Sequence, residues 1–147
     1  MIRVTRRYAF SASHRLHAAG LGEAENQRLY GKCNNPYGHG HNYALEVSVR
    51  GPVDSRSGRA VDPAALDGLV RDRILAAIDH RNLNEEIADF ARVVPTTENL
   101  GRLIHQRLKQ SWRSAFPGEW PRLEKIRIAE TERNIFEISE TNKIEAR

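Results

Sequence analysis

An alternating stretch from residue 39 to residue 50 constrains the fold of this chain more than any other feature of its sequence. Its odd positions carry apolar side chains and two histidines: His39, His41, Tyr43, Leu45, Val47 and Val49. Successive side chains of a strand point to opposite faces, so this stretch predicts a strand with one face in the core. Residues 2–13 alternate in the same way, with Val4, Tyr8 and Phe10 on one face, and predict a second strand.

Two amphipathic stretches further along the chain predict helices. The first begins at Asp62-Pro63, an N-cap residue followed by proline in the first turn, and its apolar stripe runs to Ile78. The second begins near Thr96, directly after Pro95, and its stripe runs from residue 100 to residue 112.

The remaining segments complete the expected architecture. Residues 123–130 and 135–138 predict two more strands, a short strand is expected near residues 59–61, and residues 18–38 predict a polar loop. Antiparallel strands with two helices on one face describe an α+β domain. All 147 residues are expected to form a single domain, residues 1–147.

Composition narrows the functional classes. Hydrophobic residues make up 39% and charged residues 29% of the chain, as in globular proteins, and no apolar run approaches the roughly 20 residues of a membrane span. The start lacks the apolar core of a signal peptide, and the single Cys33 can form no internal disulfide, which together favour the cytoplasm. The net charge of +4 fits a solvated basic surface or a phosphorylated substrate, whereas the sequence contains no nucleic-acid-binding motif.

His39-Gly40-His41 is the sharpest local signal for chemistry. Residues i and i+2 of a strand share a face, so both imidazoles project to the same side and can hold one metal ion. His14 ends the first predicted strand on the face of Phe10, and it can supply a third nitrogen if the two strands pair. Three imidazoles with an open fourth position describe a catalytic zinc site, while one cysteine cannot make a structural Cys-rich site.

Four other polar residues allow two interpretations each. Cys33, beside Lys32 in a polar stretch, is either an inert thiol or a thiolate base. Asp79-His80 is either an ordinary helix end or a carboxylate that orients a proton-transferring imidazole. Glu130 alternates into an apolar face, where it either reaches water or accepts two parallel N–H donors such as those of a pterin edge.

Five segments in order, spread over nearly the whole chain, together resemble the 6-pyruvoyl-tetrahydropterin synthase family. They are FSASHRL (residues 10–16), GKCNNP with GHGHNY (31–36 and 38–43), DHRNLN (79–84), PTTEN (95–99) and ETERNI (130–135). Chance does not produce five such blocks in one order, so the resemblance is specific.

The resemblance implies the tunnelling fold (T-fold), in which the sheets of three subunits close a barrel and two trimers stack into a homohexamer. It implies 7,8-dihydroneopterin triphosphate as the substrate and a Zn²⁺ ion bound by His14, His39 and His41. The family's catalytic positions fall on Cys33 as the proton-abstracting thiolate, on Asp79 and His80 as the proton relay, and on Glu130 as the pterin anchor. Thr97 and Glu98 fall on the pterin pocket, and Arg15 and Lys32 are expected to contact the triphosphate.

Within this resemblance two reactions stay open. The expected product is 6-pyruvoyl-tetrahydropterin, formed with release of triphosphate. The alternative is 6-carboxy-tetrahydropterin, the product of the queuosine-pathway relative, which also releases acetaldehyde. Cys33 lies six positions before His39, which is similar to the pyruvoyl type. A non-catalytic pterin- or metal-binding subunit is a distant alternative, and the presence of Cys33 and His80 argues against it.

Overall fold

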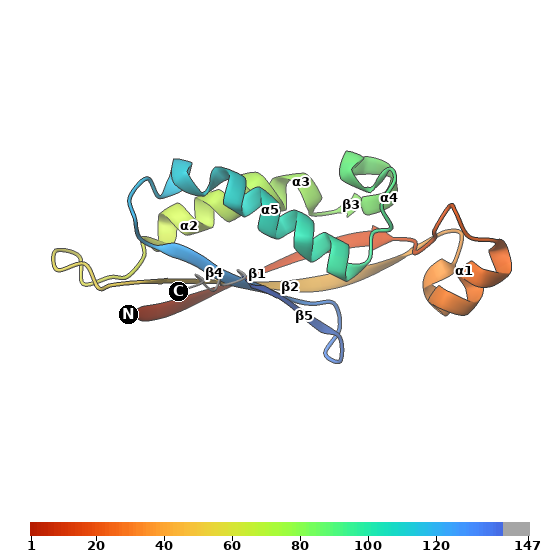
Figure 1. Cartoon of the computed structure of the whole chain (residues 1–147), viewed down its shortest axis with the longest axis horizontal. Coiled ribbons are helices and arrows are strands. Elements are labelled where there is room, and N and C mark those ends of the chain that lie inside the picture. Colours follow the sequence, from red (N-terminus) through yellow and green to blue (C-terminus); the bar gives the residue numbers. More distant parts are fainter. Residues whose placement is uncertain (140–147) are drawn as a thin grey trace, which may run out of the picture.

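The structure of the chain, a computed structural model, describes residues 1–139 and places several helices on one face of a twisted sheet (Figure 1). The five strands lie in the order β3-β1-β2-β4-β5. Their bounds are Ile2–His14 (β1), His39–Gly51 (β2), Arg81–Asn82 (β3), Arg122–Ala129 (β4) and Ile135–Ser139 (β5). Neighbouring strands are antiparallel except β3, which runs parallel to β1. The predicted α+β class is confirmed, with one short parallel strand added at the edge.

The pairing of β1 with β2 runs along both strands, from Ile2 opposite Gly51 to His14 opposite His39. In this register Ala12 lies opposite His41. Because the side-chain period of a strand is two, a slip by one residue would turn His14 away from the face that His39 and His41 share. The register therefore brings the three predicted metal ligands together at one end of the sheet.

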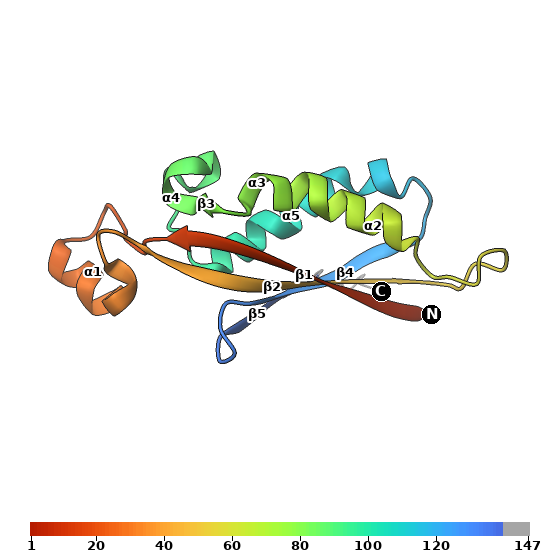
Figure 2. The same ribbon diagram turned by 180° about the vertical axis from the view of Figure 1, so that it is seen from behind.

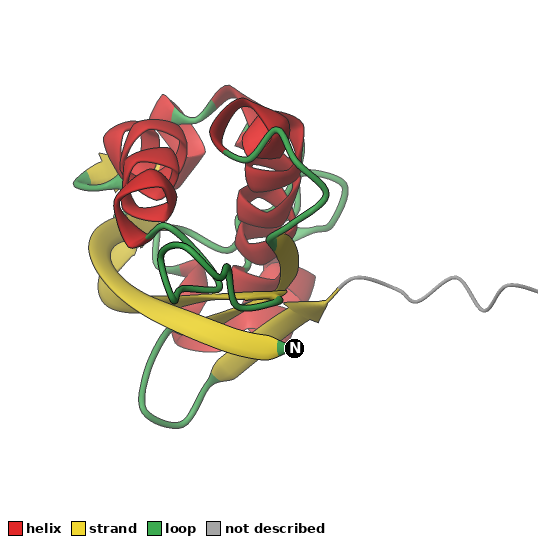
Figure 3. Cartoon of the chain, turned by 90° about the vertical axis from the view of Figure 1, so that its left-hand side faces the viewer, coloured by secondary structure: helices red, strands yellow, loops and turns green. Residues whose placement is uncertain are grey.

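A layer of helices covers one face of the sheet (Figures 1 and 3), and the burial of His14 and Tyr43 places the histidine face beneath it. Its elements are α2 (Pro63–Val70), the π turn η2 (Arg71–Leu75), α3 (Ala76–Ile78), α4 (Leu83–Glu86), the 3-10 turn η3 (Ala88–Phe90) and α5 (Thr97–Ala115). The Asp62 carboxylate accepts from the backbone N–H groups of Ala64 and Ala65, and the Thr96 hydroxyl accepts from that of Asn99. Both predicted helix starts are thus confirmed.

The core lies between the sheet and helices α2 and α5. Leu45, Val47, Leu66, Ile104 and Ile126 are fully buried there. Burial of a side chain of this size contributes about 1.5–3 kcal/mol relative to leaving it exposed. This apolar layer fixes β2 and β4 beneath α5, and the histidine cluster sits at its end.

None of the helices α2 to α5 covers the other face of the sheet (Figures 2 and 3). Charged side chains pair across the strands there: Glu46 lies 3.1 Å from Arg127 and 3.6 Å from Arg7, and Lys125 lies 3.3 Å from Glu137. Such partly exposed pairs contribute about 0–1 kcal/mol each. This face is therefore suited to water rather than to an apolar layer.

The segment predicted as a polar loop, residues 18–38, contains helix α1 (Glu23–Tyr30) and the 3-10 turn η1 (Gly31–Asn34). Asn26 is the buried residue of α1, and its amide bonds the N–H and carbonyl of Ala18 and the carbonyls of Leu21 and Gly22. A helix held by a polar side chain lacks the apolar stripe that periodicity detects, so the sequence prediction missed it.

The short strand expected near residues 59–61 is wrong. Both edges of β2 are already paired, one with β1 and one with β4, so the returning chain has no free edge of β2 to join. The preceding turn does form, since the Gly58 N–H donates to the Asp54 carbonyl at 2.8 Å. Among the described residues, no helix has both the length and the apolar character needed to cross a membrane.

Candidate metal centre and active site

The imidazoles of His14, His39 and His41 meet where β1 ends and β2 begins. Their ring centroids lie 4.7 Å (His14–His39), 5.1 Å (His14–His41) and 4.7 Å (His39–His41) apart. One nitrogen of each ring lies within 4.8 Å of the others. His14 Nε2 and His39 Nε2 are 3.1 Å apart, close to the roughly 3.3 Å that separates two nitrogens bound 2.0–2.1 Å from a tetrahedral zinc ion.

A backbone carbonyl fixes the orientation of His14. Its Nδ1–H donates to the carbonyl of Pro95 at 2.8 Å, and Pro95 stands just before the N-cap of α5. The proton on Nδ1 leaves the lone pair of a neutral His14 on Nε2, pointing at His39. Hydrogen bonds of this kind from a ligating histidine set its tautomer and increase its basicity toward a metal.

The cluster has the electrostatics of an imidazole metal site. Burial, followed by the neighbouring imidazoles, lowers the pKa of His14, although the Pro95 carbonyl acts in the opposite sense. Burial and His41 likewise lower the pKa of His39. His39 Nδ1 and His41 Nε2 are buried without a hydrogen-bond partner among residues 1–139. Neutral rings with unpaired buried nitrogens fit a bound cation, because metal ligation requires deprotonated imidazole.

Glu130, just beyond the end of β4, belongs to the same site. Its Oε1 lies 3.5 Å from His41 Nε2 and 3.7 Å from His14 Nε2, and it accepts a hydrogen bond from the Thr97 hydroxyl at 2.8 Å. The Glu130 side chain is 13% exposed and Thr97 is buried. The predicted pterin anchor and one predicted pocket residue are thus brought together beside the histidine cluster.

Cys33 lies in η1, partly buried, and its carbonyl accepts a hydrogen bond from the Leu16 N–H at 2.8 Å. This bond ties the thiol-bearing turn to a residue two positions after His14. Burial, and then the Glu130 carboxylate, raise the pKa of the Cys33 thiol in the metal-free chain. For a thiolate base beside Lys32, as the sequence allowed, a lowered pKa would be needed. The protein groups around Cys33 instead favour the neutral thiol.

Asp79 and His80 lie along the edge of β1, between α3 and β3. The His80 N–H donates to the Ser11 carbonyl at 2.7 Å, and the Asp79 carboxylate accepts from the Ser11 N–H at 2.9 Å. His80 Nε2 lies 3.6 Å from Asp79 Oδ2, and the His80 side chain is 82% exposed. His80 also lines a shallow cavity of about 490 Å³ together with His41.

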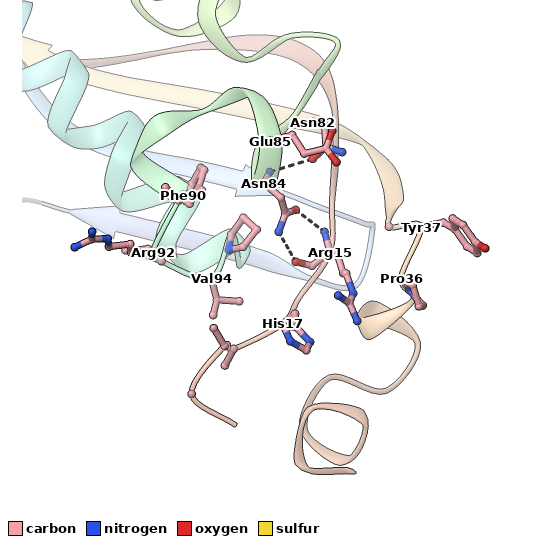
Figure 4. Close-up of a pocket in the computed structure, with 17 residues that line it drawn as sticks. Arg15, His17, Pro36, Tyr37, Asn82, Asn84, Glu85, Phe90, Arg92 and Val94 are labelled. Carbon is pink, nitrogen blue, oxygen red and sulfur yellow. Dashed lines mark hydrogen bonds between the residues drawn. The ribbon is translucent and has the colours of Figure 1, made fainter. Parts of the chain in front are cut away.

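The remaining predicted residues separate into those near the site and those away from it. Arg15, which directly follows His14 in the chain, lines a second cavity of about 710 Å³ (Figure 4). Lys32 and Glu98 are exposed, and neither lines the two described cavities. Geometry within the chain therefore favours Arg15 and Thr97 over Lys32 and Glu98 as substrate contacts.

The sequence analysis gave no role to two polar groups of the site. The Asn84 amide brackets the backbone of Arg15, accepting from its N–H at 2.7 Å and donating to its carbonyl at 2.9 Å. The buried Tyr43 hydroxyl has no hydrogen-bond partner among the described residues, and Tyr43 stacks on Phe10 with centroids 4.9 Å apart. Burial and the nearby Glu130 carboxylate raise the pKa of Tyr43. Asn84 stands in the DHRNLN block and Tyr43 on the histidine face, so position alone could have indicated both.

Comparison with known proteins identifies the family. The family model described as 6-pyruvoyl tetrahydropterin synthase matches residues 3–141. The chain belongs to the 6-pyruvoyl tetrahydropterin synthase family. The resemblance found in the sequence blocks is therefore confirmed, and with it the assignment of the chain as a lyase of this family.

Individual relatives support this membership. The chain is 44% identical over 132 residues to the 6-pyruvoyl tetrahydrobiopterin synthase of Poecilia reticulata, covering 90% of this chain and 86% of that protein. It is 41% identical over 132 residues to the human protein of the same name, covering 90% and 87%. The solved structure of 6-pyruvoyl tetrahydropterin synthase from Caenorhabditis elegans superimposes with a TM-score of 0.85 at 38% identity, covering 95% of this chain and 96% of that one.

A relative named for the alternative reaction is more distant. The putative 6-carboxy-5,6,7,8-tetrahydropterin synthase of Archaeoglobus fulgidus is 31% identical over 100 residues, covering 68% of this chain and 74% of that protein. The expected resemblance to the pyruvoyl type over the carboxy type is consistent with this difference. The T-fold expected for the subunit is confirmed by the structural match.

Proposed function

We propose that this chain converts 7,8-dihydroneopterin triphosphate into 6-pyruvoyl-tetrahydropterin and triphosphate. The observation that carries the proposal is the junction of three imidazoles with a partly buried carboxylate: Glu130 Oε1 lies 3.5 Å from His41 Nε2. A metal ligand set beside an acceptor for the pterin N–H edge suits a substrate whose ring and hydroxylated side chain are held at the same time.

The free thiol of Cys33 also fits a reducing compartment, and we place the reaction in the cytoplasm.

Zinc is the ion we propose for the cluster. Three histidines with an open fourth position are the ligand set of catalytic zinc sites, and the 3.1 Å spacing of His14 Nε2 and His39 Nε2 fits its short bonds. When bound, the ion would supply Lewis acidity that makes the C–H and O–H groups of the substrate side chain easier to deprotonate.

Glu130 and Cys33 take the roles next to the substrate in this proposal. The Glu130 carboxylate accepts the two parallel N–H donors of the pterin, while the Thr97 hydroxyl holds its Oε1 in place. Cys33 then removes a side-chain proton as a thiolate. Since burial raises the pKa of its thiol in the metal-free chain, the charge of the bound ion must help to form that thiolate.

The exposed position of His80, beside the half-buried Asp79, supports a site shared between subunits. Proton transfer is best controlled where bulk water is excluded, yet the His80 side chain is 82% exposed in the single chain. We propose that neighbouring subunits of a homohexamer, built as two stacked trimers, cover this pair and let it relay protons. The β1 edge next to Ser11, where the pair is bound, would then face a subunit interface.

Product analysis tests the proposed reaction. The purified, zinc-loaded protein is incubated with 7,8-dihydroneopterin triphosphate, and the pterin product is identified by mass while acetaldehyde is trapped. A pyruvoyl pterin with released triphosphate is expected. Stoichiometric acetaldehyde with a carboxylated pterin would instead establish the alternative reaction.

A further inference from the structure

The larger cavity, of about 710 Å³, is lined by Arg15, His17 and Arg92 among others (Figure 4), and none of the three clustered histidines lines it. Three of its lining residues adjoin the cluster. Arg15 follows His14, Gly38 precedes His39, and Pro95 accepts the hydrogen bond from His14 Nδ1. The cavity therefore borders the chain segments that carry His14 and His39.

Arg15 and His17 supply hydrogen-bond donors to the cavity, and a single asparagine orients both. Arg15 Nε donates to the Asn34 carbonyl at 3.2 Å, and within residues 1–139 the two terminal guanidinium nitrogens make no hydrogen bond. The Asn34 Nδ2 amide donates to His17 Nδ1 at 3.0 Å, so a neutral His17 carries its proton on Nε2. The same Nδ2 donates to the Leu16 carbonyl at 2.7 Å, which fixes the orientation of the amide.

The charges around the cavity favour an anion. Arg92 lies at its rim, exposed and without an ion pair among the described residues, and in Figure 4 its side chain extends away from Arg15. Glu85 is the acidic member of the described lining, against two arginines and one histidine. Planar guanidinium groups match the oxygens of phosphate, and a long exposed side chain such as that of Arg92 can rotate toward a bound anion.

We infer that Arg15 and His17 bind a polyphosphate group, with Arg92 as a rim cation. The inference rests on the proposed function and extends it to the leaving group. In the proposed substrate the triphosphate hangs from the last side-chain carbon, beyond the hydroxyl groups that would lie at the histidines. Donors placed there hold the charge that develops when the carbon–oxygen bond breaks. The sequence indicated Arg15 and Lys32 for this contact, whereas the cavity selects Arg15, His17 and Arg92.

Binding of inorganic tripolyphosphate to the zinc-loaded protein tests this inference without turnover. Isothermal titration is carried out on the native chain and on Arg15→Gln, His17→Gln and Arg92→Gln, with orthophosphate as a second ligand. Arg56→Gln is the matched control, since Arg56 lies in the exposed turn that follows the end of β2, whereas His39 and His41 lie where β2 begins. Arg15→Gln and His17→Gln should each weaken tripolyphosphate binding about tenfold, Arg92→Gln less, and Arg56→Gln not at all.

Two further readouts keep the test decisive. Binding of unphosphorylated dihydroneopterin should stay unchanged in His17→Gln, because the proposed pterin anchor Glu130 does not line the cavity. Zinc content and circular dichroism identify any variant that fails to fold. If Arg15→Gln fails to fold, His17→Gln still provides the test. Equal tripolyphosphate affinity in all variants, or binding no tighter than that of orthophosphate, would overturn the inference.

The outcomes also separate this inference from the proposed reaction. If tripolyphosphate binding depends on Arg15 and His17 but no pyruvoyl pterin forms, the anion site stands and the proposed reaction fails. If the pyruvoyl pterin forms at equal rates in the native chain and in both variants, with unchanged KM, the reaction stands and the anion site is wrong.

Discussion

Replacing Asn84 by alanine should loosen the metal centre from a distance. Asn84 does not touch the three histidines; its amide accepts from the Arg15 N–H at 2.7 Å and donates to the Arg15 carbonyl at 2.9 Å. Arg15 directly follows the proposed ligand His14, at the point where β1 has no further strand partner. The Asn84 amide thus bonds the backbone N–H and carbonyl of Arg15, as the neighbouring strand β2 bonds the backbone of β1.

The size of the effect follows from the two hydrogen bonds. Each contributes about 0.5–1.5 kcal/mol net, and a buried group left unpaired costs about 1–3 kcal/mol. We therefore expect Asn84→Ala to lower the free energy of unfolding by about 2 kcal/mol. Loss of an interaction that orients a ligand typically weakens metal binding about 10–100-fold, and we expect the lower end because the Pro95 carbonyl still orients His14.

Urea unfolding of the metal-free and zinc-loaded protein, together with zinc competition against a chromophoric chelator, measures both quantities. Asn42→Ala is the matched control, since Asn42 also adjoins a proposed metal ligand, but among residues 1–139 its exposed amide bonds only the Ser11 hydroxyl, at 2.7 Å. That control should change stability by less than about 0.5 kcal/mol. Native zinc affinity and a native urea midpoint in Asn84→Ala would refute the bracing role.

Three further predictions concern the site and the assembly. Cys33→Ala should fold and keep its zinc but lose nearly all turnover, with kcat reduced more than KM, as steady-state kinetics would measure; turnover near the native rate would make Cys33 a structural thiol. Glu130→Gln should weaken binding of a simple pterin such as sepiapterin by about 1–3 kcal/mol, because one acceptor oxygen becomes a donor that opposes the pterin N–H edge; unchanged affinity in a fluorescence titration would contradict the anchor role. Sedimentation should find a homohexamer, since a single sheet leaves strand edges open, and an active monomer at low concentration would exclude the shared site.

The sequence was sufficient to predict the metal centre because strands impose a strict period. The alternation around His39 and His41 put both imidazoles on one face, and His14 was expected to join them if the first two strands paired; the structure supplies the register that sets His14 opposite His39. Helix starts were equally accessible, since Asp62 and Thr96 are side-chain caps with a local signature. In each case the signal lies within a few residues or follows from one pairing.

Other parts of the site depend on contacts without a period. Asn84 is 69 positions from Arg15 in the chain, and Asn34 is 18 positions from Leu16, so no spacing rule connects them. The direction of the Cys33 pKa shift depends on burial, which a polar sequence context did not indicate. The exposed position of His80 was also beyond prediction, because the groups proposed to cover it belong to other subunits.

The position of the Cys33 thiol depends on more than the number of residues between Cys33 and His39. The Gly38 N–H donates to the Asn35 carbonyl at 2.9 Å, closing a turn in which Tyr37 is 95% exposed, so this part of the loop extends toward solvent. On its other side Cys33 is bound through its carbonyl to the Leu16 N–H at 2.8 Å, two residues after His14. The thiol is therefore placed relative to the ligands by this short path and not by the longer one through the loop. Because a displacement of about 1 Å can change which proton a base reaches, substitutions that disturb the Leu16–Cys33 contact, such as those at Asn34, should alter the reaction more than changes at Tyr37 do.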